Sequence, residues 1–440
     1  MIRMQYNTIK HFANFALPYT FVLTAIFSVT EYAKPSLPFL YILNNTTLIW
    51  LISIFILVIL YFSKEYFYDD INKKNTSVLT YYLFWTFICI IRGMFVAEGY
   101  WEWKGLITNI MGLLLPLVAY SSTNKVVVQT MLGYYVKYAL PLFLILVFLI
   151  RRDAFGSYLM PISFLMLFLP ALSNRKKVIL LLIVAVVMIA DLSSRSNVIK
   201  FGVPILLLSI YYLRDKITSK LLESVRLVLI IAPLLFFTLA VTGVFNVFNM
   251  NEYLGERKVV GVDNEGKRVE QDMAVDTRTF IYEEVLESAM RNDYWIFGRT
   301  PARGNDSAVF GAATFELTRR YERLANEVGV ANVFTWMGVI GVLLYLFVFF
   351  KASYLAVNHS RNIYAKMMGI FVAFRWMYSW IEDINNFTLN YFMLWILIGL
   401  CFSHSFRNMS DYEVTIWIRG VFDKRYLNFD KYLDKEENEK

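Results

Sequence analysis

Long apolar runs are the feature that most constrains this chain of 440 residues. A helix needs roughly 20 mostly apolar residues to cross about 30 Å of hydrocarbon. By that criterion we predict about twelve spans, at residues 13–30, 38–62, 79–98, 105–121, 133–150, 155–172, 177–192, 196–213, 226–247, 332–352, 363–381 and 387–406. Charged residues make up only 18% of the chain, against about 25% in soluble domains. The sequence therefore predicts an all-α, polytopic transmembrane helical bundle.

The spans predict four regions. About nine of them lie in residues 1–247, a polar segment occupies 248–331, three more spans fill 332–406, and 407–440 form a tail. The first run lacks a small-residue cleavage site, so we expect no cleavable signal peptide. This layout predicts a multi-pass protein of a bacterial inner membrane.

Lys and Arg in the short loops predict the orientation, because cytoplasmic loops carry an excess of them. With the N-terminus in the cytoplasm, the inner loops and tail hold Lys64, Lys73, Lys74, Arg175, Lys176, Lys177, Arg214, Lys216, Lys220, Lys351, Arg361, Arg407, Arg419, Lys424 and Arg425. The basic pair Arg151 and Arg152 falls on the other side, against the trend. Both termini are therefore expected inside and segment 248–331 in the periplasm. The net charge of +8 is scattered between apolar runs, which argues against nucleic acid as a partner.

The polar segment predicts a loop or hairpin that turns at Asp263–Gly266. An amphipathic helix is expected to begin near Asp276, with Asp276 or Thr277 as its N-cap. Its apolar residues recur at helical spacing: Phe280, Ile281, Val285, Leu286 and Met290.

Cysteine and histidine predict neither a metal site nor a cofactor. Cys89 and Cys401 both lie inside apolar runs, and no C-x-x-C motif occurs. His11, His359 and His404 have no other ligand type at metal-binding spacing.

Charged residues at membrane depth are costly, and they commonly have a function or a partner. Asp191 and Arg195 flank the outer end of one span, and Arg375 lies inside another whose outer end holds Glu382 and Asp383. Arg375, Ser379 and Glu382 would share a helix face, so an ion pair between Arg375 and Glu382 that only tethers spans is an equal alternative.

Arginines are frequent in the polar segment, where Arg278, Arg299 and Arg303 are the main candidates. A guanidinium group binds phosphate oxygens bidentately at any working pH, so these arginines suit a lipid-linked diphosphate. The alternative is a salt-bridged helix surface, because five glutamates lie nearby: Glu283, Glu284, Glu287, Glu316 and Glu322.

The sequence GRTPARGND, from Gly298 to Asp306, could also form a backbone nest for an anion. Asn326 and Glu327 precede Gly338 and Gly341, two small residues that favour close helix packing.

In their order along the chain these motifs resemble the O-antigen ligase and polymerase superfamily of integral membrane glycosyltransferases. The matching pieces are Ser194-Arg195 at the end of a span, Arg278 to Tyr282 as R-x-x-x-(W/Y) in a helix that leads to Gly298, and Gly338 to Gly341 at a span entry. The resemblance covers roughly residues 180–350. The family has a His-Asn pair before the last motif, where this chain has Glu327 and Val328 preceded by Asn326.

The resemblance implies transfer of a polyprenyl-diphosphate-linked glycan to an acceptor sugar at the periplasmic face, without metal or cofactor. Arg195 and Arg278, helped by Arg299 or Arg303, would bind the donor diphosphate, and Glu327 would be the general base. Asp191, Tyr282, Asn326, Arg375 and Glu382 are supporting candidates; Tyr282 and Trp295 could stack on sugars or simply pack the amphipathic helix.

The missing histidine favours a polymerase, whose acceptor is another lipid-linked repeat unit, over a ligase, whose acceptor is lipid A-core. A chain-length regulator is then a further partner, besides the lipid bilayer. A lipid-linked oligosaccharide flippase is the alternative from another class, although no internal repeat typical of transporters is evident.

Overall fold

The chain is almost entirely helical, as the sequence predicts. The computed structural model describes residues 2–34, 44–190, 195–248, 258–262, 268–272, 278–308 and 310–427. Within those residues the strands are four short ones, all between residues 258 and 323: β1 (Lys258–Val262), β2 (Arg268–Asp272), β3 (Asn305–Asp306) and β4 (Glu322–Arg323). The all-α class is therefore confirmed.

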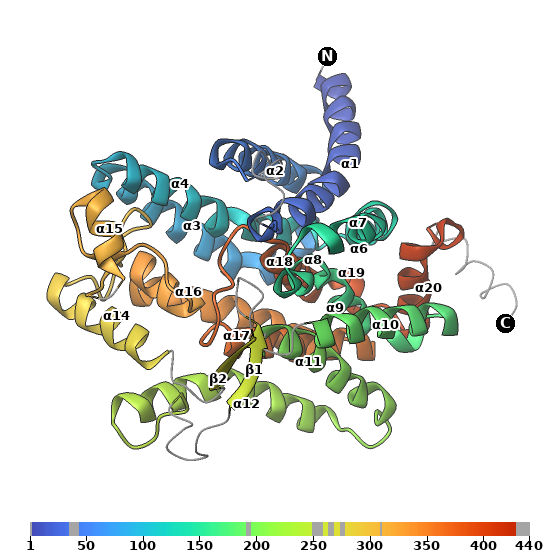
Figure 1. The fold of residues 1–440 in the computed structure, drawn as a ribbon. Coiled ribbons are helices and arrows are strands. Elements are labelled where there is room, and N and C mark those ends of the chain that lie inside the picture. The colour runs from blue at the N-terminus through green and yellow to red at the C-terminus, as the bar shows by residue number, and fades with distance from the viewer. Residues whose placement is uncertain are drawn as a thin grey trace, which may run out of the picture.

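The helices of the first half are α1 (Ile2–Phe27), α2 (Thr46–Phe67), α3 (Lys73–Val96), α4 (Tyr100–Leu114), α5 (Val118–Ser121), α6 (Lys125–Tyr134), α7 (Leu140–Leu149), α8 (Phe155–Tyr158), α9 (Met160–Met166), α10 (Asn174–Ala190), α11 (Arg195–Tyr212) and α12 (Ser219–Val241). The helices of the second half are α14 (Thr279–Asn292), α15 (Gly311–Thr318), α16 (Gly329–Asn358), α17 (Ile363–Tyr378), α18 (Leu389–Phe402), α19 (His404–Arg407) and α20 (Asp411–Phe422). Figure 1 shows them as one bundle with α18 near its centre.

Seven helical segments of the described chain are long and apolar enough to cross a membrane: Phe15–Tyr32, Thr46–Phe67, Asp70–Val96, Tyr100–Ser121, Lys125–Leu149, Ser219–Val241 and Gly329–Asn358. Their outward faces are apolar. On α12 the exposed side chains are Leu221, Val225, Val228, Ile231 and Leu235, which recur every three or four residues. Exposed apolar stripes of this length are costly in water and suit hydrocarbon, so the chain is a helical membrane protein.

The remaining predicted spans differ from that simple pattern. Residues 155–172, expected as one span, form α8, α9 and a 3₁₀ turn, because Pro161 and Pro170 interrupt the hydrogen bonding of a longer helix. Helices α10, α17 and α18 have 17, 16 and 14 residues, which makes them shorter than the other spans. The twelve-span layout stays a prediction.

The core lies where α16, α17 and α18 meet. Every residue of α18 is buried, which explains why its sequence is apolar on all sides. Trp336, Trp376 and Trp395, one from each helix, are fully buried there. These three helices hold the turn between α17 and α18, at residues 379–388, in a fixed place.

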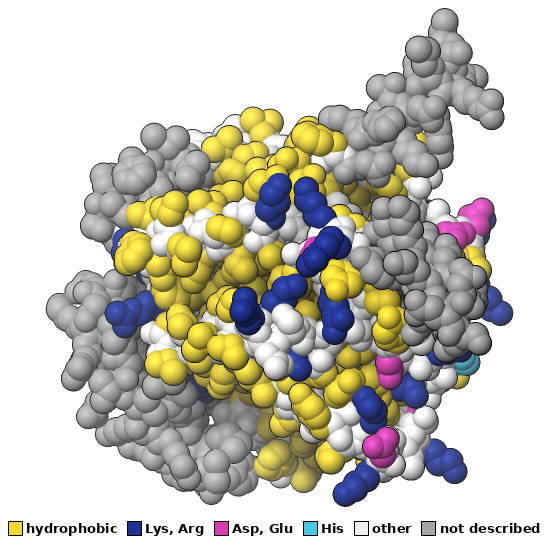
Figure 2. Space-filling view, turned by 90° about the vertical axis from the view of Figure 1, so that its right-hand side faces the viewer, with side chains coloured by type: hydrophobic (Ala, Val, Ile, Leu, Met, Phe, Trp, Pro, Cys, Tyr) yellow, Lys and Arg dark blue, Asp and Glu magenta, His cyan; other side chains and the backbone are white. Residues whose placement is uncertain are grey.

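Two opposite ends of the bundle differ in composition. Helices α14 and α15 lie at one end, and α20 lies at the other (Figure 1). At the α20 end, Lys176 Nζ lies 4.8 Å from the centre of the Phe422 ring, and the Arg361 N–H donates to the Arg407 carbonyl at 2.8 Å. Figure 2 views this end and shows Lys and Arg side chains gathered on it. Several segments that the sequence predicts to be cytoplasmic thus share one face.

The polar segment contains the predicted hairpin and amphipathic helix. Strands β1 and β2 pair antiparallel, with Lys258 opposite Asp272 and Val262 opposite Arg268. Helix α14 buries Ile281, Val285 and Ala289 at four-residue spacing. Both elements are confirmed, whereas the predicted turn at Asp263–Gly266 and the predicted caps Asp276 and Thr277 lie outside the described residues.

A break inside α16 receives the loop that follows α14. Gly338 has a φ of +67°, which interrupts the helix, and the loop residues bond to the groups set free. Arg299 and Thr300 donate their N–H groups to the carbonyls of Thr335 and Trp336, at 2.7 and 3.2 Å. The Val339 N–H donates to the Trp295 carbonyl at 2.8 Å. The predicted close approach at Gly338 is therefore made by a loop instead of a second helix.

Candidate functional site

The turn between α17 and α18 is the meeting point of several charged groups. The Glu382 carboxylate accepts hydrogen bonds from Lys200 Nζ at 2.5 Å and from Ser196 Oγ at 2.6 Å, as well as from the Tyr378 hydroxyl. Ser196 and Lys200 are four residues apart on α11, so they present one face to the turn. Burial opposes ionisation of Glu382, but Lys200 and the hydrogen bonds together hold its pKa below the ordinary value.

Arg278 binds the residue next to Glu382 along the same turn. Its Nε donates to the Ile381 carbonyl at 2.8 Å, and its Nη1 lies 2.9 Å from Glu327 Oε2. The Gly329 N–H, two residues after Glu327, donates to the Glu382 carbonyl at 3.2 Å. The structure thus brings together Arg278, Glu327 and Glu382, three of the residues that the sequence singles out.

Glu327 is the most exposed member of this group, with 61% of its side chain accessible. One carboxylate oxygen faces Arg278, and the other lies 3.4 Å from Arg323 Nη2. Both oxygens therefore face a guanidinium group.

Arg195 begins α11 and is exposed, one residue before the Ser196 that binds Glu382. Among the described residues it has no hydrogen bond or ion pair, so its guanidinium is available to a ligand. Its predicted companions Asp191 and Ser194 lie outside the described residues.

The lining of an apolar groove of about 490 Å³ includes Thr279, the residue that follows Arg278. Helix α12 contributes Pro233, Phe236 and Phe237 to it, and α14 contributes Tyr282, Leu286 and Met290. Ile381, whose carbonyl binds Arg278, is also part of the lining. The guanidinium group therefore sits at the edge of a surface that suits a hydrocarbon chain.

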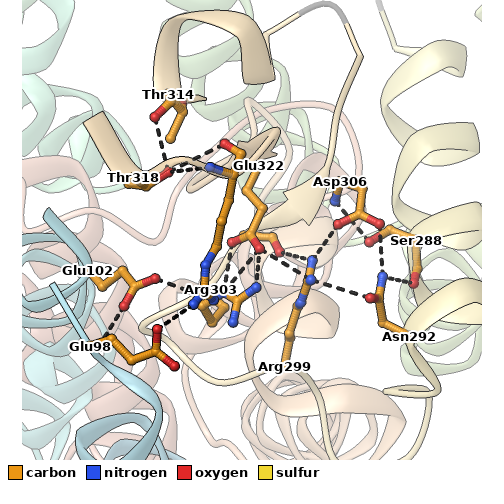
Figure 3. Close-up of polar contacts among 12 residues, drawn as sticks. Glu98, Glu102, Ser288, Asn292, Arg299, Arg303, Asp306, Thr314, Thr318 and Glu322 are labelled. Carbon is orange, nitrogen blue, oxygen red and sulfur yellow. Dashed lines mark hydrogen bonds and ion pairs between the residues drawn. The ribbon is translucent and has the colours of Figure 1, made fainter. Parts of the chain in front are cut away.

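Arg299 and Arg303 lie in another pocket, of about 730 Å³, whose lining includes neither Arg278 nor Glu327. Arg303 forms an ion pair with Glu322, and Arg299 lies 3.2 Å from Glu322 and 2.7 Å from Asp306 (Figure 3). Burial opposes ionisation of Asp306, but hydrogen bonds from Arg299 and Asn292 keep its pKa below the ordinary value. The predicted diphosphate arginines thus divide into two groups.

The same network attaches the loop to the start of α4. Arg320 pairs with Glu98 at 2.7 Å and with Glu102 at 3.4 Å, and Glu102 Oε2 also accepts the Gly99 N–H (Figure 3). The predicted anion nest in Gly298–Asp306 is wrong for the N–H groups of Arg299 and Thr300, because both are bonded to α16.

The other supporting candidates have structural partners. Arg375 is buried, and it donates a hydrogen bond to Asn390 Oδ1 at 2.9 Å. The predicted ion pair between Arg375 and Glu382 is wrong, because α17 ends at Tyr378 and Glu382 pairs with Lys200 instead. The Tyr282 hydroxyl donates to the Trp380 carbonyl at 2.7 Å. Asn326 is buried, and its N–H donates to Asn332 Oδ1 at 2.6 Å.

Sequence reasoning missed Lys200 and Tyr378, and it gave Asp383 only a place beside Glu382 at the end of a span, without a role. One signal could have found Lys200, because it is a charged residue inside the predicted span 196–213, one helical turn after Ser196. The carboxylate of Asp383 accepts hydrogen bonds from the Asn385 N–H at 3.0 Å and from Asn386 Nδ2 at 2.6 Å. Only the turn conformation reveals that contact.

Comparison with known proteins adds no relative: no family model, no curated protein and no solved structure matches this chain.

Proposed function

We propose that the chain is a periplasmic-face glycosyltransferase that polymerises polyprenyl-diphosphate-linked repeat units into a surface polysaccharide of a bacterium. In this proposal about twelve spans cross the inner membrane, both termini are cytoplasmic, and segment 248–331 is periplasmic. The basic face at the α20 end, opposite α14 and α15, supports this orientation (Figure 2).

The observation that carries the proposal is the hydrogen bond from Arg278 to Ile381, a residue that lines the apolar groove. A polyprenyl diphosphate needs both features together, since its isoprenoid chain requires apolar surface and its diphosphate requires fixed positive charge. The guanidinium group is held between the Ile381 carbonyl and Glu327, so it is oriented before a ligand arrives. When the donor loses its diphosphate, the guanidinium stabilises the charge that develops on the leaving group.

The remaining arginines have different parts in this proposal. Arg195 is the second diphosphate ligand, because it is exposed and directly precedes the Ser196 that contacts the same turn. Arg299 and Arg303 both face Glu322, whose side chain is only 5% exposed, so we assign them to holding the loop.

Glycan analysis of a deletion strain tests the proposal. Loss of a polymerase leaves single repeat units on the final acceptor, whereas loss of a ligase leaves long polymer on the polyprenyl carrier. Loss of a flippase traps single repeats on the cytoplasmic side. Only the first outcome supports polymerisation.

Complementation of that strain tests the site. Arg278→Ala should reduce polymer by about 100-fold or more, as removal of a group that stabilises transition-state charge commonly does. Arg319→Gln is the matched control, because the Arg319 side chain is exposed and makes no hydrogen bond or ion pair among the described residues. Equal membrane amounts of all variants must be shown by immunoblot; an Arg278→Ala protein with normal polymer would refute the assignment.

A further inference from the structure

A polar cavity of about 530 Å³ lies on the other side of the same turn. The end of α1, the start of α2, α4, α11 and the turn before α18 all contribute to it. Its lining mixes apolar side chains, such as Ile49, Ile52 and Met111, with polar ones, such as Lys104, Thr108, Lys200, Glu382 and Asp383. None of the residues proposed to bind the diphosphate lies in this lining.

The turn separates the cavity from the apolar groove. Ile381 lines the groove, and the next two residues, Glu382 and Asp383, line the cavity. A lipid carrier in the groove and a sugar in the cavity would therefore meet at one turn. This is the arrangement that a transfer from a lipid-linked donor to a sugar acceptor requires.

The lining of the cavity suits a carbohydrate. Hydroxyl, amide and carboxylate groups can bond to the many hydroxyl groups of a sugar, and the Trp50 side chain offers an aromatic face for a pyranose ring. Trp50 is held in place by a 3.3 Å hydrogen bond from its Nε1 to Thr108 Oγ1. A hydrocarbon chain would leave these polar groups without partners.

Asp383 differs from the other two carboxylates at the turn. Glu382 is paired with Lys200, and Glu327 faces Arg278 and Arg323. The hydrogen bonds to Asp383 come from the neutral Asn385 and Asn386, and among the described residues no Lys or Arg side chain donates to it. Burial raises the pKa of Asp383 to about 6, near the range in which a carboxylate can both hold and release a proton.

Resting on the proposed transfer function, we infer that the polar cavity binds the acceptor sugar and that Asp383 is the general base. The acceptor hydroxyl oxygen attacks the anomeric carbon of the donor, while its proton passes to the Asp383 carboxylate. The bond between that carbon and the diphosphate oxygen breaks, and the electron pair leaves with the polyprenyl diphosphate beside Arg278. In this scheme Glu327, predicted from the sequence to be the base, positions Arg278.

The experiment uses the purified full-length protein in detergent and the lipid-linked repeat extracted from the deletion strain. Asp383→Asn keeps the size of the side chain and removes its basicity, so the rate of polymer formation should fall about 100-fold or more. Glu316→Gln, a change at an exposed position of α15 without a contact among the described residues, is the matched control and should keep the wild-type rate.

Two further measurements separate catalysis from folding. The Asp383→Asn protein should elute as the wild type does and should still bind the lipid-linked repeat in a pull-down with near-wild-type affinity. Trp50→Ala should raise KM about tenfold with little change in kcat, and Trp50→Phe should restore most of that loss. An Asp383→Asn enzyme with at least half of the wild-type rate would overturn the base assignment, and an unchanged KM in Trp50→Ala would overturn the sugar site.

The outcomes also separate this inference from the proposed function. If the wild-type protein forms no polymer and its deletion leaves the surface glycan unchanged, the proposed function fails. If the wild type polymerises and Asp383→Asn does so equally well, only the inference fails.

Discussion

Two clusters of charged residues at the same end of the molecule show contrasting uses of arginine. In the loop after α14, Arg299 and Arg303 face Asp306 and Glu322, so the positive and negative groups satisfy one another (Figure 3). At the turn before α18, Arg278 binds one backbone carbonyl and one exposed carboxylate, next to an apolar groove. The first arrangement holds a loop in place, and the second fixes a guanidinium group against Ile381, a residue that lines the groove.

The difference shows why the number of arginines was a poor guide to the site. Glu322 is only 5% exposed, so its ion pairs are shielded from water and have little to offer a ligand. Glu327 is 61% exposed and reaches the surface where a substrate would arrive. Burial and partner identity, rather than charge alone, distinguish a structural arginine from a ligand-binding one.

The largest expected effect on stability is in the loop cluster. Glu322→Gln removes the carboxylate partner of Arg303 and leaves Arg299 with Asp306 alone, which should lower the free energy of unfolding by about 3–5 kcal/mol. Thermal unfolding of the purified protein, followed by fluorescence, measures this change, with Glu316→Gln as the control. A shift no larger than that of the control would mean that the cluster does not hold the loop.

Gly338→Ala should have the next largest effect, because it acts where the loop enters α16. A side chain at φ +67° is strained, and its Cβ would collide with the Ile296 carbonyl, so we expect a loss of about 1–3 kcal/mol. Gly202→Ala is a suitable control, since a Cβ there meets no atom within 4 Å. Limited proteolysis should cut the loop of Gly338→Ala faster; equal cutting of both variants would contradict the role of the break.

At the turn, Glu327→Gln should have a smaller effect than Asp383→Asn. The change weakens the ion pair that positions Arg278 but does not remove the base. We therefore expect the KM for the lipid-linked repeat to rise about tenfold, which corresponds to about 1.4 kcal/mol, while kcat changes little. Loss of kcat with an unchanged KM would instead make Glu327 the base, as the sequence predicts, and would exclude Asp383 from that role.

The smallest effect is the pH dependence. The base form of Asp383 is present above its raised pKa of about 6 and is lost as the pH falls through that value, so kcat should be halved near pH 6. The charged or titratable groups around the cavity are Glu31, Tyr32, Lys104, Lys200 and Glu382. Rates measured from pH 5 to 8 test this, and Asp383→Asn should abolish the transition; a mutant that keeps it would assign the titration to another group.

Elements whose signals are local were predictable from the sequence. Helix α14 follows from the spacing of Ile281 and Val285, and the β1–β2 hairpin follows from two short segments around a turn-forming sequence. The proximity of Arg278 and Glu327 also followed, because both were expected at the outer surface beside the same loop. The partner of Glu382 could not be predicted from the sequence. The expected partner, Arg375, is near Glu382 along the chain, whereas the actual partner, Lys200, is 182 positions away on α11.

The sequence by itself determined that this is a helical membrane protein, because apolar runs of span length have few other stable arrangements. It also singled out a small set of arginines and carboxylates as candidates for a functional site. Only the tertiary structure decided which of them are neutralised by one another and which face a groove or a cavity. Those pairings depend on contacts between α11, α14 and the turn before α18, and side-chain contacts of such long sequence separation leave no periodic signal along the chain.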